Sequence, residues 1–142
     1  MIVNDRADLA KLSGAAGVHV GQDDLAPAAA RRLLGADAII GFSTHTIDQV
    51  GDAMVAPATY VAVGPVFGTA TKDTGYNAVG LELIEAAVSR AEGRPIVAIG
   101  GITLERAPSV IVAGASAVAV IGDLLSTGDP TQRVRSYLEA LA

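Results

Sequence analysis

The strongest constraint on the fold is a repeated alternation, along the whole chain, of short apolar runs rich in Val and Ile with amphipathic segments. Continuous apolar runs of this kind are typical of strands that are buried on both faces of a parallel sheet. The runs lie at residues 2–3, 17–20, 38–42, 60–63, 95–99 and 117–121. The amphipathic segments predict helices at residues 7–12, 27–34, 46–55, 81–91, 104–112 and 130–141. The sequence therefore predicts an α/β fold with parallel strands and right-handed crossovers.

The residue pattern alone leaves two architectures open, a doubly wound open sheet and a (β/α) barrel. Both place ligand-binding loops after the carboxyl ends of the strands. No linker, short repeat or low-complexity segment divides the 142 residues. We therefore expect one domain over residues 1–142, with its chemistry in the loops that follow the strands.

Composition narrows the class of protein. Half of the residues are apolar (51%), and 10 Lys and Arg stand against 15 Asp and Glu, giving a net charge of −5. This balance excludes a largely disordered chain and argues against a nucleic-acid surface. The absence of Cys excludes disulfides and thiolate metal sites. The longest apolar stretch, residues 110–121, is broken by Gly114 and Ser116 and is too short to span a bilayer. We expect a cytoplasmic protein.

Carboxylates follow the first two predicted strands. Asp5 comes after the first strand, and Asp24 ends the segment Gly-Gln-Asp-Asp after the second. If both loops open on the same face of a parallel sheet, the two side chains converge and suit Mg²⁺, which prefers hard oxygen ligands. Asp residues before a helix are also ordinary N-caps. The residues alone leave both interpretations open.

The loop after the third strand holds several polar side chains. Ser43 lies at the strand end, where it can hydrogen-bond a substrate, and Thr44 or Thr46 can cap the next helix. His45 invites an acid–base role, but no nucleophile-elbow glycine pattern surrounds it. His19 lies within a predicted strand, where we expect a hydrogen-bonded interior histidine.

The remaining loops are rich in glycine. Residues 64–73 form the longest loop, in which glycines, Thr hydroxyls and Lys72 match the needs of a phosphate, although a plain surface loop is an equal alternative. Gly101 and Gly122 lie between a strand end and a helix start, where backbone N–H groups can hold an anion. The alternative there is a tight turn with Thr103 as an N-cap.

Six motifs follow one another along the chain: Asn4-Asp5-Arg6, Gly17-Val18-His19-Val20-Gly21-Gln22-Asp23-Asp24, Gly41-Phe42-Ser43-Thr44-His45, Gly64-Pro65-Val66-Phe67, Thr69-Ala70-Thr71-Lys72 and Ala98-Ile99-Gly100-Gly101-Ile102. In order and spacing they resemble the thiamine-phosphate synthase family, over essentially the whole chain. The resemblance implies a (β/α)₈ barrel. It also implies a Mg²⁺-dependent transferase that joins a hydroxymethylpyrimidine diphosphate to a thiazole phosphate, releasing pyrophosphate.

The same resemblance implies a role for individual residues. It assigns Mg²⁺ to Asp5 and Asp24, and the pyrophosphate to Asn4 and Lys72. Ser43 is matched to the pyrimidine. Ser43 and Lys72 are the two residues assigned to catalysis. The thiazole phosphate is matched to the Thr side chains and backbone groups of Thr69, Thr71, Gly101, Ile121 and Gly122.

Two departures from the family pattern carry expectations. Gly122 replaces a usual Ser, so a hydroxyl contact is lost while the backbone N–H remains. Residues 1–4 match the third family strand, so we expect an incomplete barrel of about six βα units, strands 3 to 8, where a full barrel has roughly 200 residues or more. A basic pair that the family carries on its second strand is not matched, so we expect poor activity from this chain alone. Open barrel edges favour association of copies into a homo-oligomer.

Two other functions remain as hypotheses. One is a thiazole tautomerase-like isomerase of the same fold, which would use His45 and would not need both the paired carboxylates and the Thr-x-Thr-Lys segment. The other is an inactive truncated remnant that binds phosphate weakly.

Overall fold

The computed structural model describes residues 1–68 and 75–142. Within them, six parallel strands form one sheet whose order follows the chain from β1 to β6. The strands are β1 (Ile2–Asn4), β2 (Gly17–Val20), β3 (Ile39–Thr44), β4 (Tyr60–Val63), β5 (Ile96–Ile99) and β6 (Ala117–Ala119). The helices are α1 (Ala7–Ser13), α2 (Pro27–Leu34), α3 (Ile47–Val55), α4 (Gly80–Arg90), α5 (Ala107–Val112), α6 (Gly122–Leu125) and α7 (Pro130–Ala140). Strand and helix alternate as the sequence predicts.

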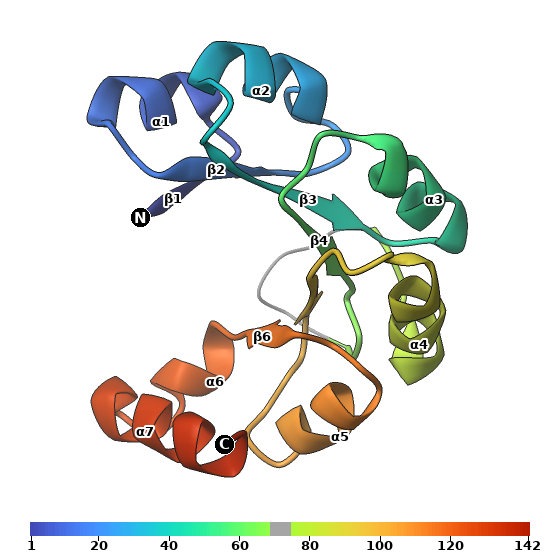
Figure 1. Cartoon of the computed structure of the whole chain (residues 1–142). Coiled ribbons are helices and arrows are strands. Elements are labelled where there is room, and N and C mark those ends of the chain that lie inside the picture. The colour runs from blue at the N-terminus through green and yellow to red at the C-terminus, as the bar shows by residue number, and fades with distance from the viewer. Residues whose placement is uncertain (69–74) are drawn as a thin grey trace.

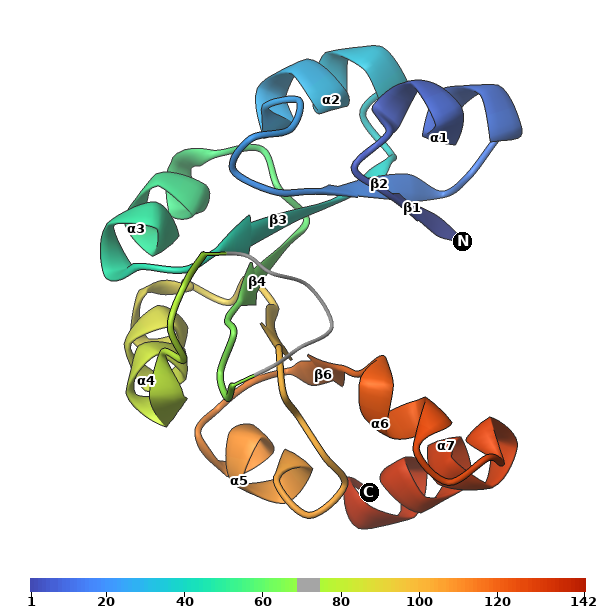
Figure 2. The same ribbon diagram turned by 180° about the vertical axis from the view of Figure 1, so that it is seen from behind.

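The strands line the inner side of a curved arc, and the helices cover its outer side (Figure 1). The view from behind shows the same arrangement, with β1 and β6 at the two edges of the sheet (Figure 2). Helices on one side of a curved parallel sheet are the architecture of a (β/α) barrel, here incomplete. The doubly wound alternative, which has helices on both faces, is wrong.

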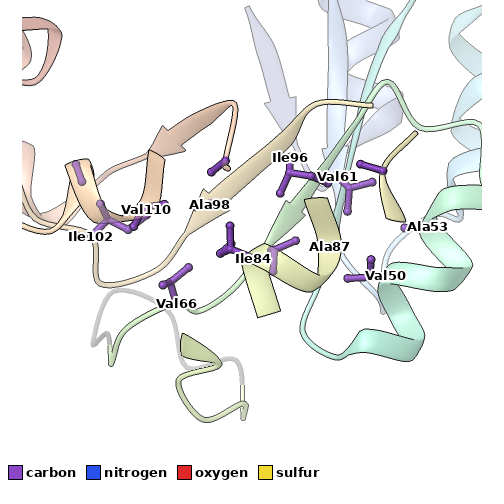
Figure 3. Packing of buried hydrophobic residues seen from close by; sticks show 14 of the residues in the cluster. Val50, Ala53, Val61, Val66, Ile84, Ala87, Ile96, Ala98, Ile102 and Val110 are labelled. Atoms are coloured by element: carbon purple, nitrogen blue, oxygen red, sulfur yellow. The ribbon is translucent and has the colours of Figure 1, made fainter. Parts of the chain in front are cut away.

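The hydrophobic core lies between the sheet and the outer helices. Its larger cluster joins β4 and β5 to α3, α4 and α5, and Figure 3 shows Val50, Val61, Ala87 and Ile96 gathered there. A smaller cluster joins β2 and β3 to α1 and α2. Phe42 packs against both clusters, so the two halves of the arc share one continuous apolar layer.

The inner face of the sheet carries the alternate residues of each strand, because side chains along a strand point to opposite faces in turn. Register aligns Asn4 with His19, His19 with Gly41, and Gly41 with Tyr60 across the first four strands. The apolar neighbours of these residues face the helices. The inner face is therefore the place where polar groups of several strands meet.

Most elements differ from the expected ranges by a residue or two, and three differences matter most for the loops after the strands. Strand β3 continues through Thr44, so Ser43 lies inside the strand. Helix α5 begins at Ala107 instead of residue 104, because residues 104–106 form a turn in which the Arg106 and Ala107 N–H groups donate to the Thr103 carbonyl. Helix α6 is not among the helical ranges that the amphipathic pattern predicts, since a helix of this length is too short to show a hydrophobic period. Among the described helices, none has the length and apolar character needed to cross a membrane.

Helix α3 begins with a side-chain cap. The Thr46 Oγ1 accepts a hydrogen bond from the Gln49 N–H at 3.2 Å, as one of the sequence alternatives predicts. We expect Thr46→Ala to lower the free energy of unfolding by about 1 kcal/mol, the usual contribution of such a cap. Thr46→Ser should retain most of it, because the hydroxyl remains. Urea denaturation of the three proteins measures this, and an alanine variant as stable as the serine variant would contradict it.

Candidate active site

Asp5 lies directly after β1 and against the end of β2. Its φ is +62°, in the left-handed region that Asp tolerates better than most residues, and its N–H donates to the His19 carbonyl at 2.7 Å. Helix α1 takes Arg6 as its N-cap residue, with no side-chain cap among the described residues. The structure therefore does not support the capping interpretation of Asp5.

Asp24 lies in the loop between β2 and α2. Its Oδ2 accepts a hydrogen bond from the Gly21 N–H at 2.7 Å, which closes the loop on itself. Helix α2 begins later, at Pro27, with Ala26 as its N-cap residue. The capping interpretation of Asp24 is therefore wrong. Its second carboxylate oxygen is Oδ1.

The two carboxylates fit the chemistry of Mg²⁺. Outside residues 69–74, no group of three or more His, Asp or Glu side chains gathers as a cage for a metal. Mg²⁺ does not need such a cage, because it usually keeps several waters and binds one or two protein carboxylates together with substrate phosphates. Asp5 and Asp24 are two such carboxylates, in the loops that follow the paired strands β1 and β2.

Ser43 lies on the inner face of β3, with 9% of its surface exposed. Its Oγ is 2.8 Å from the His19 Nε2, and the His19 Nδ1 is 2.9 Å from the Tyr60 hydroxyl. The expectation of a hydrogen-bonded interior histidine is confirmed. The Gln22 side-chain amide donates to the Ser43 carbonyl at 2.6 Å and ties the Asp24 loop to β3.

Sequence reasoning did not assign Tyr60 or Gln22 to the site. Tyr60 begins β4, at an inner-face position that aligns with Gly41 on β3, and so lies two strands from His19 on β2. The signal that identifies it is register: once the strands are placed in chain order, every second residue points inward. Gln22 is within a motif that we singled out, but loop geometry decides its partner.

His45 is held in place by contacts with Gly64 and Tyr76. Its Nδ1 donates to the Gly64 carbonyl at 2.5 Å, because a carbonyl oxygen only accepts, and its ring stacks on Tyr76 with centroids 4.0 Å apart. Thr44 is fully buried and donates to the Ala62 carbonyl at 2.9 Å, so it does not cap α3. These contacts describe a structural histidine and favour no acid–base role for it.

The glycine loops after β4 and β5 pack directly on each other. The Val66 N–H donates to the Ile99 carbonyl at 2.8 Å, and the Phe67 N–H donates to the Gly100 carbonyl at 3.1 Å. At Gly101, where φ is +63°, a Cβ would lie 2.5 Å from the Gly68 carbonyl oxygen. Glycine is therefore required for these two loops to meet.

Arg106 is a cation beside this junction that sequence reasoning missed. Its guanidinium carbon lies 4.8 Å from the centroid of the Phe67 ring, and its Nη1 donates to the Gly101 carbonyl at 3.0 Å. A guanidinium over an aromatic face is a favourable pairing. Arg106 thus stabilises the loop that carries Gly101.

The loop after β6 leads into α6 and is anchored by Asp123. Ile121 precedes the helix with 66% of its surface exposed, and Gly122 is the first helical residue. Asp123 accepts from the Leu104 N–H at 3.2 Å, which links the loops after β5 and β6. Its carboxylate also accepts two hydrogen bonds from Arg133, at 2.9 and 3.0 Å.

Charge and burial shift the pKa values in this anchor. The Arg133 guanidinium holds the pKa of Asp123 below its usual value. The Tyr137 hydroxyl donates to Asp123 at 2.7 Å, and burial, followed by this carboxylate, raises the pKa of Tyr137. Asp123 has only 11% of its side chain exposed, and its carboxylate accepts hydrogen bonds from Leu104, Arg133 and Tyr137.

The other predicted site residues are distributed along the same edge of the sheet or fall outside the description. Asn4 ends β1 with an exposed side chain. Thr69, Thr71 and Lys72 lie outside the described residues. The described site therefore has two parts, the carboxylates at β1 and β2 and the glycine loops at β5 and β6, with Ser43 on β3 between them.

Comparison with known proteins identifies relatives of this chain. A family model described as thiamine monophosphate synthase matches residues 1–124. The thiamine-phosphate synthase of Koribacter versatilis (strain Ellin345) is 48% identical over 141 residues, and that of Roseiflexus sp. (strain RS-1) is 44% identical over 142 residues. Thiamine phosphate pyrophosphorylase from Pyrococcus furiosus superposes with a TM-score of 0.86 at 29% identity, covering 99% of this chain and 68% of that one.

The relatives are longer than this chain. The match covers 99% of the chain but 65% of the Koribacter protein, and 100% of the chain but 60% of the Roseiflexus protein. The chain thus spans a little under two thirds of the length of these relatives.

Proposed function

The chain belongs to the thiamine monophosphate synthase family, and we propose that it acts as a transferase that makes thiamine phosphate. The substrates are 4-amino-2-methyl-5-(diphosphooxymethyl)pyrimidine and a thiazole phosphate, and the second product is pyrophosphate. The observation that carries the proposal is the order of groups along one edge of the sheet. Two carboxylates, a buried serine and paired glycine loops follow one another there, in a chain 48% identical to a named synthase.

In this proposal the diphosphate lies at the β1 and β2 end of the site. Asp5 and Asp24 hold Mg²⁺, which when bound neutralises charge on the phosphate oxygens. Asn4 and Lys72 contact the departing pyrophosphate, and Lys72 stabilises the negative charge that develops on it. Ser43 contacts the pyrimidine ring from β3.

The thiazole phosphate lies at the other end. The hydroxyl groups of Thr69 and Thr71 and the backbone N–H groups of Gly101, Ile121 and Gly122 bind its oxygens. Backbone N–H groups beside glycine are suited to this task, because no side chain blocks their approach to a phosphate. The Asp123 anchor keeps the loops after β5 and β6 together, and so keeps the phosphate-binding groups in place.

The reaction exchanges one bond for another. The bond between the pyrimidine methylene carbon and the diphosphate oxygen breaks, and its electron pair leaves with pyrophosphate. The lone pair of the thiazole nitrogen then forms the new bond to that carbon. No proton is removed, so the scheme does not require a general base, and the structural role of His45 agrees with it.

Incubating the purified chain with both phosphorylated substrates and Mg²⁺ tests the proposal. We expect thiamine phosphate and pyrophosphate in equal amounts and none without Mg²⁺. Turnover should be at least about tenfold slower than that of the Koribacter synthase, because Lys72 is the one cation among the assigned residues. A folded chain that forms no thiamine phosphate and binds no pyrophosphate in the presence of Mg²⁺ would contradict the proposal.

The named relatives give no support to the isomerase alternative. A cytoplasmic location, a single domain over residues 1–142 and association of copies through the sheet edges stay predictions. Size-exclusion chromatography with light scattering measures the last of these.

A further inference from the structure

Three polar side chains from neighbouring strands form a hydrogen-bonded row on the inner face of the sheet. Tyr60 on β4 contacts His19 on β2 through the His19 Nδ1, at 2.9 Å, and the His19 Nε2 contacts the Ser43 Oγ on β3, at 2.8 Å. The Tyr60 and His19 rings are stacked, with centroids 5.6 Å apart and planes 25° from parallel. Both nitrogens of the imidazole therefore have defined partners, and Ser43 is the end of the row.

Gly41 makes the row possible. It lies on β3 between His19 and Tyr60 in register, two residues before Ser43 and on the same face. A Cβ at this position would lie 2.2 Å from the Tyr60 Cζ and 2.4 Å from the His19 Nδ1. The phenol and the imidazole thus meet in the space that the absent side chain leaves.

The row has a direction. A neutral imidazole has one N–H donor and one acceptor nitrogen, so either Tyr60 donates to His19 and His19 donates to Ser43, or every bond is reversed. A phenol O–H is more acidic than a serine O–H and is the stronger donor, which favours the first arrangement. Burial raises the pKa of Tyr60, so its proton is present throughout the neutral range.

In the favoured arrangement the His19 proton is on Nε2 and points at the Ser43 oxygen. One lone pair of Ser43 is then occupied, and its own hydrogen is directed elsewhere. Without His19, a serine hydroxyl rotates and can donate or accept equally well. The row thus converts an ambiguous hydroxyl into one that donates.

We propose that Tyr60 and His19 are positioning residues that hold Ser43 as a hydrogen-bond donor toward an unprotonated ring nitrogen of the aminopyrimidine substrate. This inference rests on the proposed function for the identity of the acceptor. Neither positioning residue touches the reacting bond. Their effect is to orient the pyrimidine, and so the affinity for that substrate should change more than the affinity for the thiazole phosphate.

The position of the His19 proton can be measured without any substrate. The chain has two histidines, so long-range ¹H–¹⁵N correlation spectra of the ¹⁵N-labelled chain contain two imidazole patterns, and His19→Gln assigns them. We expect the proton on Nε2 of His19. Tyr60→Phe should shift that equilibrium, whereas Tyr76→Phe should leave it unchanged, because Tyr76 stacks on His45 instead.

Calorimetric titration with the pyrimidine diphosphate and Mg²⁺ gives the second readout. His19→Leu removes the donor to Ser43 and should weaken pyrimidine diphosphate binding by about tenfold, the effect of losing one hydrogen bond. His19→Gln keeps an N–H donor near the position of Nε2 and should restore most of the affinity. Binding of the thiazole phosphate should be the same in all three proteins. Circular dichroism melting identifies any variant that fails to fold, in which case Tyr60→Phe replaces it.

The outcomes are distinguishable. A proton on Nδ1 of His19 in the wild-type chain overturns the inference, since the row would then run in reverse. A proton on Nε2 with unaltered pyrimidine affinity in the variants overturns the positioning role and leaves the proposed function standing. Failure of the wild-type chain to bind pyrimidine diphosphate at all overturns the proposed function, and the inference with it.

Discussion

Replacing Asp24 with asparagine should abolish Mg²⁺-dependent binding of pyrophosphate and lower any turnover by at least about a hundredfold. Asparagine has the shape of aspartate and its Oδ1 can still accept the hydrogen bond from the Gly21 N–H, so the loop keeps its fold. Only the charge is lost, and a metal ion that binds through two carboxylates depends on that charge. Asp5→Asn should behave in the same way, because asparagine also tolerates the left-handed backbone of this position.

Asp23→Asn is the matched control. Asp23 is the exposed neighbour of Asp24, and its substitution changes the net charge of the chain by the same amount. Calorimetric titration of Mg²⁺ into each protein with pyrophosphate present separates a specific ligand from a general charge effect. Equal affinities in Asp23→Asn and Asp24→Asn would show that Asp24 is not a metal ligand.

Replacing Asp123 with asparagine should lower the free energy of unfolding by about 2–3 kcal/mol, since a charged acceptor of four hydrogen bonds is lost in a side chain that is 11% exposed. The amide would turn an N–H group toward the Arg133 donors or toward the Tyr137 hydroxyl. In a domain of this size we expect the melting temperature to fall by about 6–10 °C. Differential scanning calorimetry measures the change.

Asp8 provides the contrast. It also accepts two hydrogen bonds from one guanidinium, that of Arg6, and this contact lowers the pKa of Asp8 to about 2. Both side chains are more than half exposed, so water and salt screen the pair. Asp8→Asn should leave the melting temperature nearly unchanged. If the two variants melt together, the Asp123 anchor does not stabilise the fold in the way that its burial implies.

The effect of Asp123 should depend on pH in a defined direction. Its pKa in the folded chain lies below the ordinary 3.8, so the folded state binds the proton less readily than the unfolded state. The stability that it contributes is therefore complete above pH 3.8 and is lost as the pH falls through the lower, folded value. The stability gap between wild type and Asp123→Asn should stay constant from pH 7 to 5 and narrow below about pH 4. A gap that closes at pH 6 would point to a different titrating group.

The sequence predicts the alternation of the fold well because each strand and helix has its own local pattern. Buried Val and Ile runs identify the strands, and glycine, which favours helix ends, directly follows α1 at Gly14 and α2 at Gly35. The curvature of the sheet is not predictable in this way, because a doubly wound sheet and a (β/α) barrel share the same local pattern. Only the placement of all helices on one side of the sheet decides between them.

The candidate site is predictable to the extent that its residues follow strand ends. Asp5, Asp24 and Gly101 are found in this way, because the carboxyl ends of parallel strands share one edge. The side chains that contact the site residues are harder to predict from the sequence. The contact of Tyr60 with His19 depends on strand register, and the contact of Arg106 with Phe67 depends on the turn that delays the start of α5. Neither leaves a mark in the local sequence.

The chain-order arrangement of the strands has a consequence for how the molecule opens. Every pairing in the sheet joins strands that are consecutive in the chain, so each βα unit depends mainly on its two neighbours, much as repeats do in a solenoid. Strands β3 and β4 have a paired neighbour on each side and fully buried residues, whereas β1 and β6 have one neighbour each. Breathing should therefore begin at the two ends of the arc and move inward, and amide protons near Ser43 should exchange among the slowest. Ser43, the proposed donor to the pyrimidine, thus lies in the last part of the chain to open, and Asp5, the proposed Mg²⁺ ligand, in one of the first.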